Sequence, residues 1–153
     1  MNMFKFLGAA LIPCAFTLAQ TPTSVQAVAL VKSAVAFAKA NGVAKLIQET
    51  NQPKGKFHVA TGGELYIFIY DDRGVVKAIG FNTEALVGVN RMSLTDADGV
   101  PFIRRIVEVA TTKGRGWIDY KYPNPATNKI DSKTSYVEFY DDLIIGSGIY
   151  KEE

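Results

Sequence analysis

Residues able to bind a small anion gather in the C-terminal third of the chain, at the spacing of β-strands. In the run 116–122, Tyr120 and Tyr122 fall on one face of an expected strand and Trp117 on the other. Tyrosine hydroxyls donate hydrogen bonds and an ammonium group adds charge-assisted ones, so Lys133 beside these phenols suits a small anion. Two glycines near the end of the chain leave space for such a group. Aromatic residues at this spacing are also typical of plain packing between strands, so this pattern allows both a pocket and a core.

Signatures of catalysis and of metal binding are weak elsewhere. The single histidine, His58, has no carboxylate or cysteine cluster near it, so we interpret it as a surface residue. Gly62-Gly63 is not followed by a phosphate-binding pattern. Asp96-Ala97-Asp98-Gly99 resembles the start of a calcium loop, but its glycine comes two positions early and Val107 stands at position twelve. The sequence therefore predicts a turn there, and no enzyme, metal site or cofactor.

Length and charge restrict the function further. The chain has 153 residues, which suits one domain large enough to bury a core without metals or disulfides. Its 17 basic and 15 acidic side chains are scattered and give a formal net charge of +2. No basic stripe or polybasic segment is present, so neither nucleic acid nor an acidic membrane surface is an expected partner.

The first nineteen residues have the pattern of a secretory signal peptide. Lys5 precedes an apolar run that ends at Ala19 and is short for a membrane span, and small residues precede a cleavage site after Ala19. We expect a signal peptide over 1–19 and a periplasmic or secreted domain over 20–153. The alternatives are an inner-membrane anchor formed by residues 4–19 and lipidation at Cys14. Because Cys14 is the only cysteine, cleavage would leave a mature domain without thiol chemistry.

Two helices and a hairpin are expected in the first half of the chain. Apolar residues recur at three- and four-residue spacing through 27–40, which predicts a helix that ends at Asn41-Gly42. A shorter helix follows over 43–49. The run 65–70 reads as a strand in which Tyr66, Phe68 and Tyr70 share one face, and a turn over 71–74 joins it to a second strand.

The second half predicts an irregular segment, a helix and three strands. Residues 80–99 carry several turn signals, and an amphipathic helix follows from about 102 to 113. Strands are expected over 115–122, 133–140 and 143–150, the last two joined by a tight turn. The order predicts an α+β fold, an antiparallel sheet with the N-terminal helix on one face and the segment 80–112 covering the other. A pocket can lie under such a cover.

The ordered series of these segments resembles the single Cache domain family, the extracytoplasmic sensing domains of many bacterial chemoreceptors and histidine kinases. The resemblance rests on "AVALVKSAVAFAKANG", "GELYIFIYDDRGVV", "ALVGVNRMSLTDADGVPFIRRIVEVATTKGRGW" and "GWIDYKYPNP…KIDSKTSYVEFYDDLIIGSGIYK", and it covers roughly residues 22–151. It implies a PAS-like antiparallel sheet of five or six strands behind a long helix. It also implies a pocket between the sheet and the capping segment.

The resemblance also implies a ligand and a set of residues that bind it. Related domains commonly bind small organic acids such as acetate, propionate, lactate or pyruvate, and others bind amino acids, amines or purines. Lys133 or Arg91 would pair with a ligand carboxylate, tyrosines would orient it, and Phe68 and Trp117 would wall its apolar end. The expected ligand-binding residues are Phe68, Tyr70, Arg91, Trp117, Tyr120, Tyr122, Lys133 and Tyr136.

Two departures from the family pattern bear on the ligand. Many relatives have Ala-His-Pro where this chain has Ala78-Ile79-Gly80, and a tryptophan is frequent at the position of Tyr122.

The size of such a ligand limits its affinity, because the best small ligands gain about 1.5 kcal/mol per heavy atom. An acetate-sized ligand is therefore limited to about −6 kcal/mol, a Kd of tens of micromolar.

The resemblance suggests how the domain would act. Receptor domains of this family usually lie between two transmembrane helices, whereas this sequence ends at Lys151-Glu152-Glu153. We therefore expect a periplasmic binding protein that signals through a membrane receptor or kinase, with a homodimer through the N-terminal helix as a further possibility. The alternative is a structural or interaction domain whose pocket holds no ligand.

Overall fold

The computed structural model describes residues 21–151, so the predicted signal peptide and Cys14 lie outside the described residues. None of the helices within 21–151 is long and apolar enough to cross a membrane. Nine elements follow one another: α1 (Ser24–Asn41), α2 (Val43–Asn51), β1 (Phe68–Asp71), β2 (Val76–Ile79), α3 (Thr83–Leu86), α4 (Phe102–Lys113), β3 (Arg115–Pro123), β4 (Ile130–Tyr140) and β5 (Leu143–Tyr150).

Helix α1 begins and ends at residues suited to those positions. Thr23 caps its start, because the Gln26 backbone N–H donates to the Thr23 hydroxyl at 3.3 Å and the Gln26 side chain accepts from the Thr23 N–H at 2.8 Å. At the other end Gly42 adopts a positive φ of 88° and its N–H donates to the Ala38 carbonyl. The predicted helix stop at Asn41-Gly42 is therefore confirmed.

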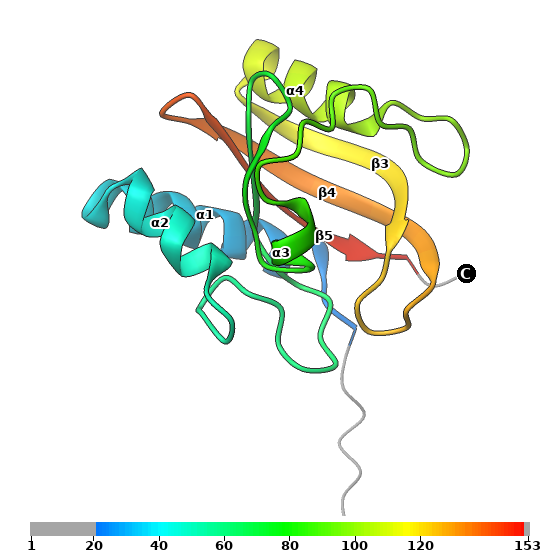
Figure 1. The fold of residues 1–153 in the computed structure, drawn as a ribbon, viewed down its shortest axis with the longest axis horizontal. Coiled ribbons are helices and arrows are strands. Elements are labelled where there is room, and N and C mark those ends of the chain that lie inside the picture. Colours follow the sequence, from blue (N-terminus) through cyan, green and yellow to red (C-terminus); the bar gives the residue numbers. More distant parts are fainter. Residues whose placement is uncertain (1–20, 152–153) are drawn as a thin grey trace, which may run out of the picture.

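The five strands form one antiparallel sheet in the order β2-β1-β5-β4-β3. The β4–β5 hairpin turns through Asp141 and Asp142, which both have positive φ, as a two-residue turn of this kind requires. This order places β1, from the first half of the chain, between β2 and the last strand. β3 and β2 form the two edges, and Figure 1 shows β3 alongside β4.

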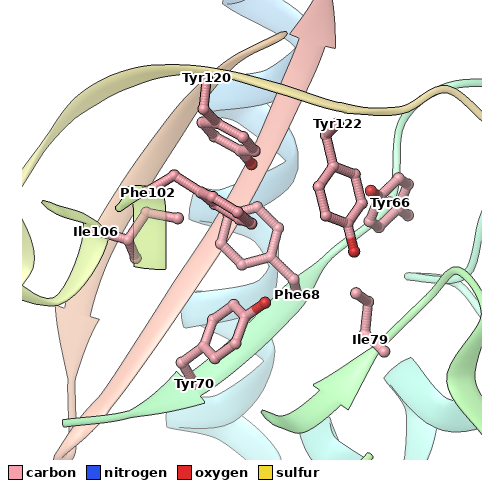
Figure 2. Close-up of a pocket in the computed structure, with 8 residues that line it drawn as sticks. All are labelled: Tyr66, Phe68, Tyr70, Ile79, Phe102, Ile106, Tyr120 and Tyr122. Atoms are coloured by element: carbon pink, nitrogen blue, oxygen red, sulfur yellow. The ribbon is translucent and has the colours of Figure 1, made fainter. Parts of the chain in front are cut away.

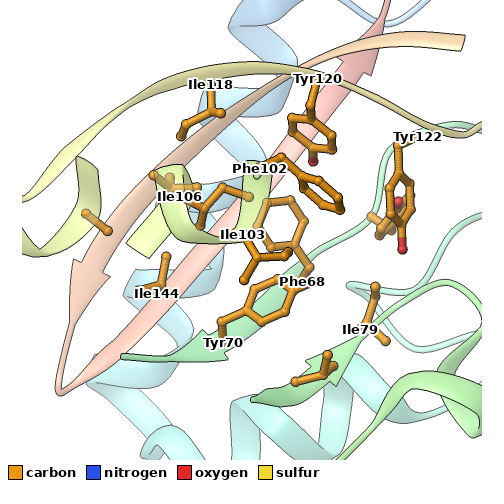
Figure 3. Close-up of a cluster of buried hydrophobic side chains, with 14 of the residues drawn as sticks. Phe68, Tyr70, Ile79, Phe102, Ile103, Ile106, Ile118, Tyr120, Tyr122 and Ile144 are labelled. Atoms are coloured by element: carbon orange, nitrogen blue, oxygen red, sulfur yellow. The ribbon is translucent and has the colours of Figure 1, made fainter. Parts of the chain in front are cut away.

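The two faces of the sheet are covered differently. Helix α1 packs on one face, where Val31 and Ala34 meet aliphatic residues of the strands such as Ile145. Helix α4 covers the other face with Phe102 and Ile106, against a cluster of mixed aromatic and aliphatic side chains (Figure 3). This arrangement confirms the predicted α+β fold, with the long helix on one face and the capping segment on the other.

The Asp96 carboxylate fastens the capping segment to the sheet. Asp96 accepts the N–H groups of Asp98 and Val100 through Oδ1, at 2.9 and 2.8 Å, which confirms the predicted turn. Its Oδ2 accepts the Lys121 N–H of β3 at 2.8 Å. The short helix α3 was not predicted. It begins after Asn82, which has a left-handed backbone (φ 54°) that the local sequence pattern did not indicate.

Candidate functional site

Alternating residues of β1 and β3 bring aromatic side chains together beneath α4. Because side chains alternate along an extended chain, Tyr66, just before β1, and Phe68 and Tyr70 within it point to the same face as Tyr120 and Tyr122. With residues of β2 and α4 they surround a cavity of about 10 Å³, roughly the space of one water molecule. Figure 2 shows the lining side chains: Tyr66, Phe68, Tyr70, Ile79, Phe102, Ile106, Tyr120 and Tyr122.

Lys133 of β4 ends among these phenols. Its side chain is 1% exposed, and its ammonium donates to the Tyr66 hydroxyl at 2.8 Å and to the Tyr150 hydroxyl at 3.3 Å. The ammonium also lies over the Tyr66 and Tyr150 rings, 4.3 and 4.8 Å from their centroids. Gly148 of β5 leaves room for its stem, since a Cβ there would come within 2.9 Å of the Lys133 Cε. The Ser135 hydroxyl and the Thr134 carbonyl would lie closer still to such a Cβ, so Gly148 accommodates groups of β4 itself, whereas the sequence suggested space for a bound anion.

The charge of Lys133 is not paired. Within residues 21–151 no acidic side chain forms an ion pair with its ammonium. Burial lowers the pKa of Lys133 to about 7, and the only opposing influence is the more distant carboxylate of Glu64. A perturbed lysine of this kind, held by neutral phenols, is a strong candidate for contact with an anion.

Arg91 supplies a second positive charge from the capping segment. Its Nη1 donates to the hydroxyls of Tyr122 and Tyr70, at 2.9 and 3.2 Å. Its backbone N–H donates to the Gly74 carbonyl at 2.8 Å, which fixes the loop against the β1–β2 hairpin. No acidic side chain of the described chain forms an ion pair with Arg91. Burial raises the pKa of Tyr70, so this phenol stays neutral beside the guanidinium.

The two cations meet around Tyr122. Arg91 donates to its hydroxyl, and the Lys133 ammonium lies over its ring, 5.2 Å from the centroid. Phe102 closes the apolar side of the same space, stacked on Tyr120 with centroids 4.6 Å apart and rings inclined by 9°. The site therefore combines the Arg91 guanidinium and the Lys133 amine, neither paired with an acidic side chain of residues 21–151, with several neutral hydroxyls and an aromatic wall.

The structure gathers six of the eight predicted ligand-binding residues and leaves two elsewhere. Trp117 is 42% exposed, and its ring centroid lies 5.4 Å from that of Tyr136, on the face of the sheet that α1 covers. The Tyr136 hydroxyl donates to Glu138 rather than toward the cavity. This corrects the expectation that Trp117 walls the pocket, because odd-numbered residues of β3 point away from α4. The residues brought together are Phe68, Tyr70, Arg91, Tyr120, Tyr122 and Lys133.

Several residues of the site, Tyr66, Tyr150 and Phe102 among them, were missed from the sequence. Tyr66 continues the alternation of Phe68 and Tyr70, so the strand pattern could have found it. Tyr150 shares its face of β5 with Gly148, and its hydroxyl also donates to the Pro123 carbonyl at 2.6 Å. No local pattern predicts that Phe102 stacks on Tyr120, since the two belong to different elements. Ile79, which stands where the family resemblance implied a histidine in many relatives, lines the cavity itself.

The fold and this pocket beneath a cap define a PAS-like sensor domain. The sequence pattern of the single Cache domain 2 family matches residues 26–153, and the chain belongs to this family. A solved structure described as the basis for carboxylic acid recognition by a Cache chemosensory domain aligns with a TM-score of 0.68 and 24% identity, covering 84% of this chain and 93% of that one. A methyl-accepting chemotaxis protein from Vibrio parahaemolyticus aligns with a TM-score of 0.67 and 22% identity, covering 82% and 86%.

Two curated relatives place this family in signalling. The chain is 29% identical over 93 residues to the sensor histidine kinase MctS of Rhizobium johnstonii, which is 60% of this chain and 19% of the kinase. It is 30% identical over 63 residues to the methyl-accepting chemotaxis protein McpP of Pseudomonas putida, which is 40% of this chain and 12% of the receptor. The chain thus spans less than a fifth of these relatives. Single Cache domains are extracytoplasmic sensory domains that bind ligands.

Proposed function

We propose that this domain binds a small organic acid of the acetate, propionate, lactate or pyruvate class between the sheet and α4. One observation carries the proposal: the Lys133 ammonium is fully buried and no carboxylate of residues 21–151 pairs with it. Removing a charge from water is unfavourable unless a counter-charge offsets it. A ligand carboxylate beside Lys133 supplies that counter-charge.

The other groups around Lys133 suit the remaining parts of such a ligand. Arg91 would share the negative charge, and the hydroxyls of Tyr70 and Tyr122 would orient the carboxylate or a neighbouring hydroxyl or keto oxygen. Phe68 and Phe102 form the apolar side, where a short alkyl chain would lie. The solved Cache domain described as recognising carboxylic acids supports this choice of ligand by its similar fold.

Binding requires the cap to move. The cavity of about 10 Å³ is far below the roughly 300 Å³ of a typical small-molecule pocket, so even a two-carbon acid must displace side chains. Phe102 is the natural group to move, because it stacks across the cavity and begins α4 next to the loop that holds Arg91. Displacing this stack reduces the net affinity, which agrees with sensing at micromolar to millimolar concentrations.

The proposed context is periplasmic. We propose that a signal peptide over residues 1–19 exports the domain, and that it presents its ligand state to a membrane receptor or kinase. Sensor kinases and chemotaxis receptors among the relatives support such a partner.

A second candidate function is an interaction domain without a ligand. The small volume of the cavity favours it, as does Ile79 at the position where relatives often have histidine. In that case the aromatic stack of Phe102 and Tyr120 is part of the permanent core.

A thermal-shift and calorimetric screen against carboxylates of two to five carbons separates these functions. A ligand at about 100 times its Kd stabilises the native state by roughly 2.7 kcal/mol, so a binding acid raises the Tm of the wild-type domain. Lys133→Met should abolish this rise, whereas Lys77→Met, an exposed lysine on strand β2, should leave it unchanged. If no acid shifts the Tm of the wild type, the interaction domain is the better description. Equal shifts in wild type and Lys133→Met would place the site elsewhere.

A further inference from the structure

Strand β3 forms one edge of the sheet. The N–H and C=O groups of successive residues therefore point alternately toward β4 and away from the sheet. The Phe139 N–H donates to the Gly114 carbonyl at 2.8 Å, so residues of β3 with even numbers bond to β4. Residues with odd numbers therefore turn their N–H and C=O groups away from the sheet. Lys121 agrees with this, because its N–H points outward and donates to Asp96.

The first part of this edge is open. The outward backbone groups of Arg115, Trp117 and Asp119 meet no hydrogen-bond partner within residues 21–151. Beyond them the edge is closed, since Asp96 occupies the Lys121 N–H and Pro123 has no N–H to offer. Proteins usually protect an edge strand, because free backbone groups recruit another strand.

The opposite edge shows the protection that β3 lacks. At β2 the Val76 N–H donates to the Val89 carbonyl at 3.0 Å, and the Val76 carbonyl accepts the Gly88 N–H at 2.8 Å. The Asn51 side chain accepts the Ile79 N–H at 3.1 Å. The fold thus covers one edge along its length and leaves a defined stretch of the other exposed.

A groove beside the open stretch leaves room for another strand. It has a volume of about 420 Å³ and lies between the exposed side of α4 and β3, with Val109 and Ile118 among its lining residues. Trp117 borders the groove and is 42% exposed, although large aromatic side chains are usually buried. An added strand would lie about 4.8 Å from β3 and fill this space.

The exposed stretch is complementary to itself. Arg115, Trp117 and Asp119 project from the same face of β3. When a second β3 pairs antiparallel and centred on Trp117, each Arg115 faces Asp119 of the second copy, and the two Trp117 residues face each other. A register centred on Arg115 or on Asp119 would oppose like charges, and the latter also needs the Lys121 N–H that Asp96 occupies.

We propose that two copies of this chain pair through their β3 edges, centred on Trp117, and join their sheets into one. The pairing would form about six backbone hydrogen bonds through the outward groups of residues 115–119. This interface is distinct from the N-terminal helix, and it does not depend on ligand binding.

A charge-reversal cycle tests the register. Sedimentation equilibrium should show a reversible dimer at protein concentrations up to about 1 mM. The sample is the naturally processed protein. Arg115→Asp and Asp119→Arg should each weaken dimerisation by about tenfold or more, because each places like charges opposite each other twice. The double variant should restore it. Asp119 also pairs with exposed Lys151 at 3.0 Å, but such a pair contributes little to stability.

Two further variants locate the interface. Trp117→Pro removes an outward N–H that the fold does not use, so it should abolish dimerisation while circular dichroism shows an intact fold. Lys77→Asp on the protected edge should change nothing. A monomer at every concentration, a dimer indifferent to the β3 variants, or a double charge variant that stays monomeric would each overturn the proposal.

Discussion

Lys133 is set apart from the other lysines of the described chain by full burial among phenols and aromatic rings. Its ammonium has hydrogen-bond acceptors in Tyr66 and Tyr150 but no ion-pair partner in the described chain. Neutral oxygens satisfy the geometry of an ammonium without neutralising its charge. The protonation of this side chain, and with it the free energy of unfolding of the domain, should therefore depend on pH and on a bound anion.

The pH dependence of stability follows from the pKa of Lys133. Burial lowers this pKa from 10.5 to about 7 in the folded domain. Between these values the unfolded chain binds more protons than the folded one, so the free energy of unfolding rises with pH, by up to about 1.4 kcal/mol per unit. Urea unfolding at pH 6, 8 and 9.5 measures this slope. It should flatten in Lys133→Met and persist in Lys77→Met.

The groups that face Lys133 limit the pH window of that experiment. Burial raises the pKa values of Tyr66 and Tyr150 above 10, so above that pH the unfolded chain loses protons first and stability falls again. Glu64 opposes the shift of Lys133 with its negative charge. An identical slope between pH 7 and 10 in wild type and Lys133→Met would show that another group controls it.

Residue-level prediction from the sequence worked where alternation along one strand was enough. The spacing of Tyr120 and Tyr122 placed both on the pocket face, and the same rule separates Trp117 from them. The contact of Lys133 with Tyr66 joins residues 67 positions apart, which no local pattern can show. The pairing of Arg91 with Tyr122 depends in the same way on the path of the capping segment.

At the scale of elements, the capping segment is held to β3 through Asp96. This carboxylate accepts three backbone N–H groups, which hold its pKa below its usual range despite the opposing effect of partial burial. Its ionised form therefore binds the cap in place. The stability that it contributes is present above its unfolded pKa of 3.8 and is lost as the pH falls below that value.

Asp96→Ala should loosen the cap. We expect a loss of about 1–2 kcal/mol in the free energy of unfolding, because three N–H groups lose their acceptor. Asp98→Ala is the matched control; its carboxylate makes only an exposed ion pair with Lys121, and the expected loss is below about 0.5 kcal/mol. Chemical denaturation of both variants at pH 7 measures the difference. Equal losses would mean that the Asp96 bridge to β3 contributes little.

The elements themselves were predicted well where strong end signals exist. The Gly42 stop of α1, the Gly114 stop of α4 and the β4–β5 turn all stand within a residue or two of their expected positions. Strand β4 begins at Ile130, three residues before the expected start, because the loop closes early: the Asn124 N–H donates to the Lys129 carbonyl at 2.7 Å. The insertion of β1 beside β5 is a long-range pairing, which the local sequence does not specify.

At the scale of the whole molecule, the two faces of the sheet have different roles. The α1 face is a mainly aliphatic core, whereas the α4 face holds most of the buried phenols, both cations and the cavity. The segment between β2 and α4 contains one helix of four residues, and none of residues 81–101 is buried. Local opening should therefore concentrate in this segment.

Hydrogen–deuterium exchange tests that division. Amides of 81–101 should exchange faster than those of β4 and β5, and a bound carboxylate should slow exchange in 81–101 and at the start of α4. Exchange in α1 should stay unchanged, because that helix packs on the other face. Uniform slowing across the domain would show that the ligand acts on global stability alone, and that the cap has no separate motion.

Trp117 is the only tryptophan of the chain, and it lies outside the pocket and at the open edge. Its fluorescence is thus a label that the protein already carries. Emission excited at the red edge of indole absorption, where the seven tyrosines absorb little, reports on the solvent around β3 alone. A blue shift that grows with protein concentration would record pairing of the edges. A carboxylate that fills the pocket should leave the emission almost unchanged, so one spectrum can follow assembly while the melting temperature follows the ligand.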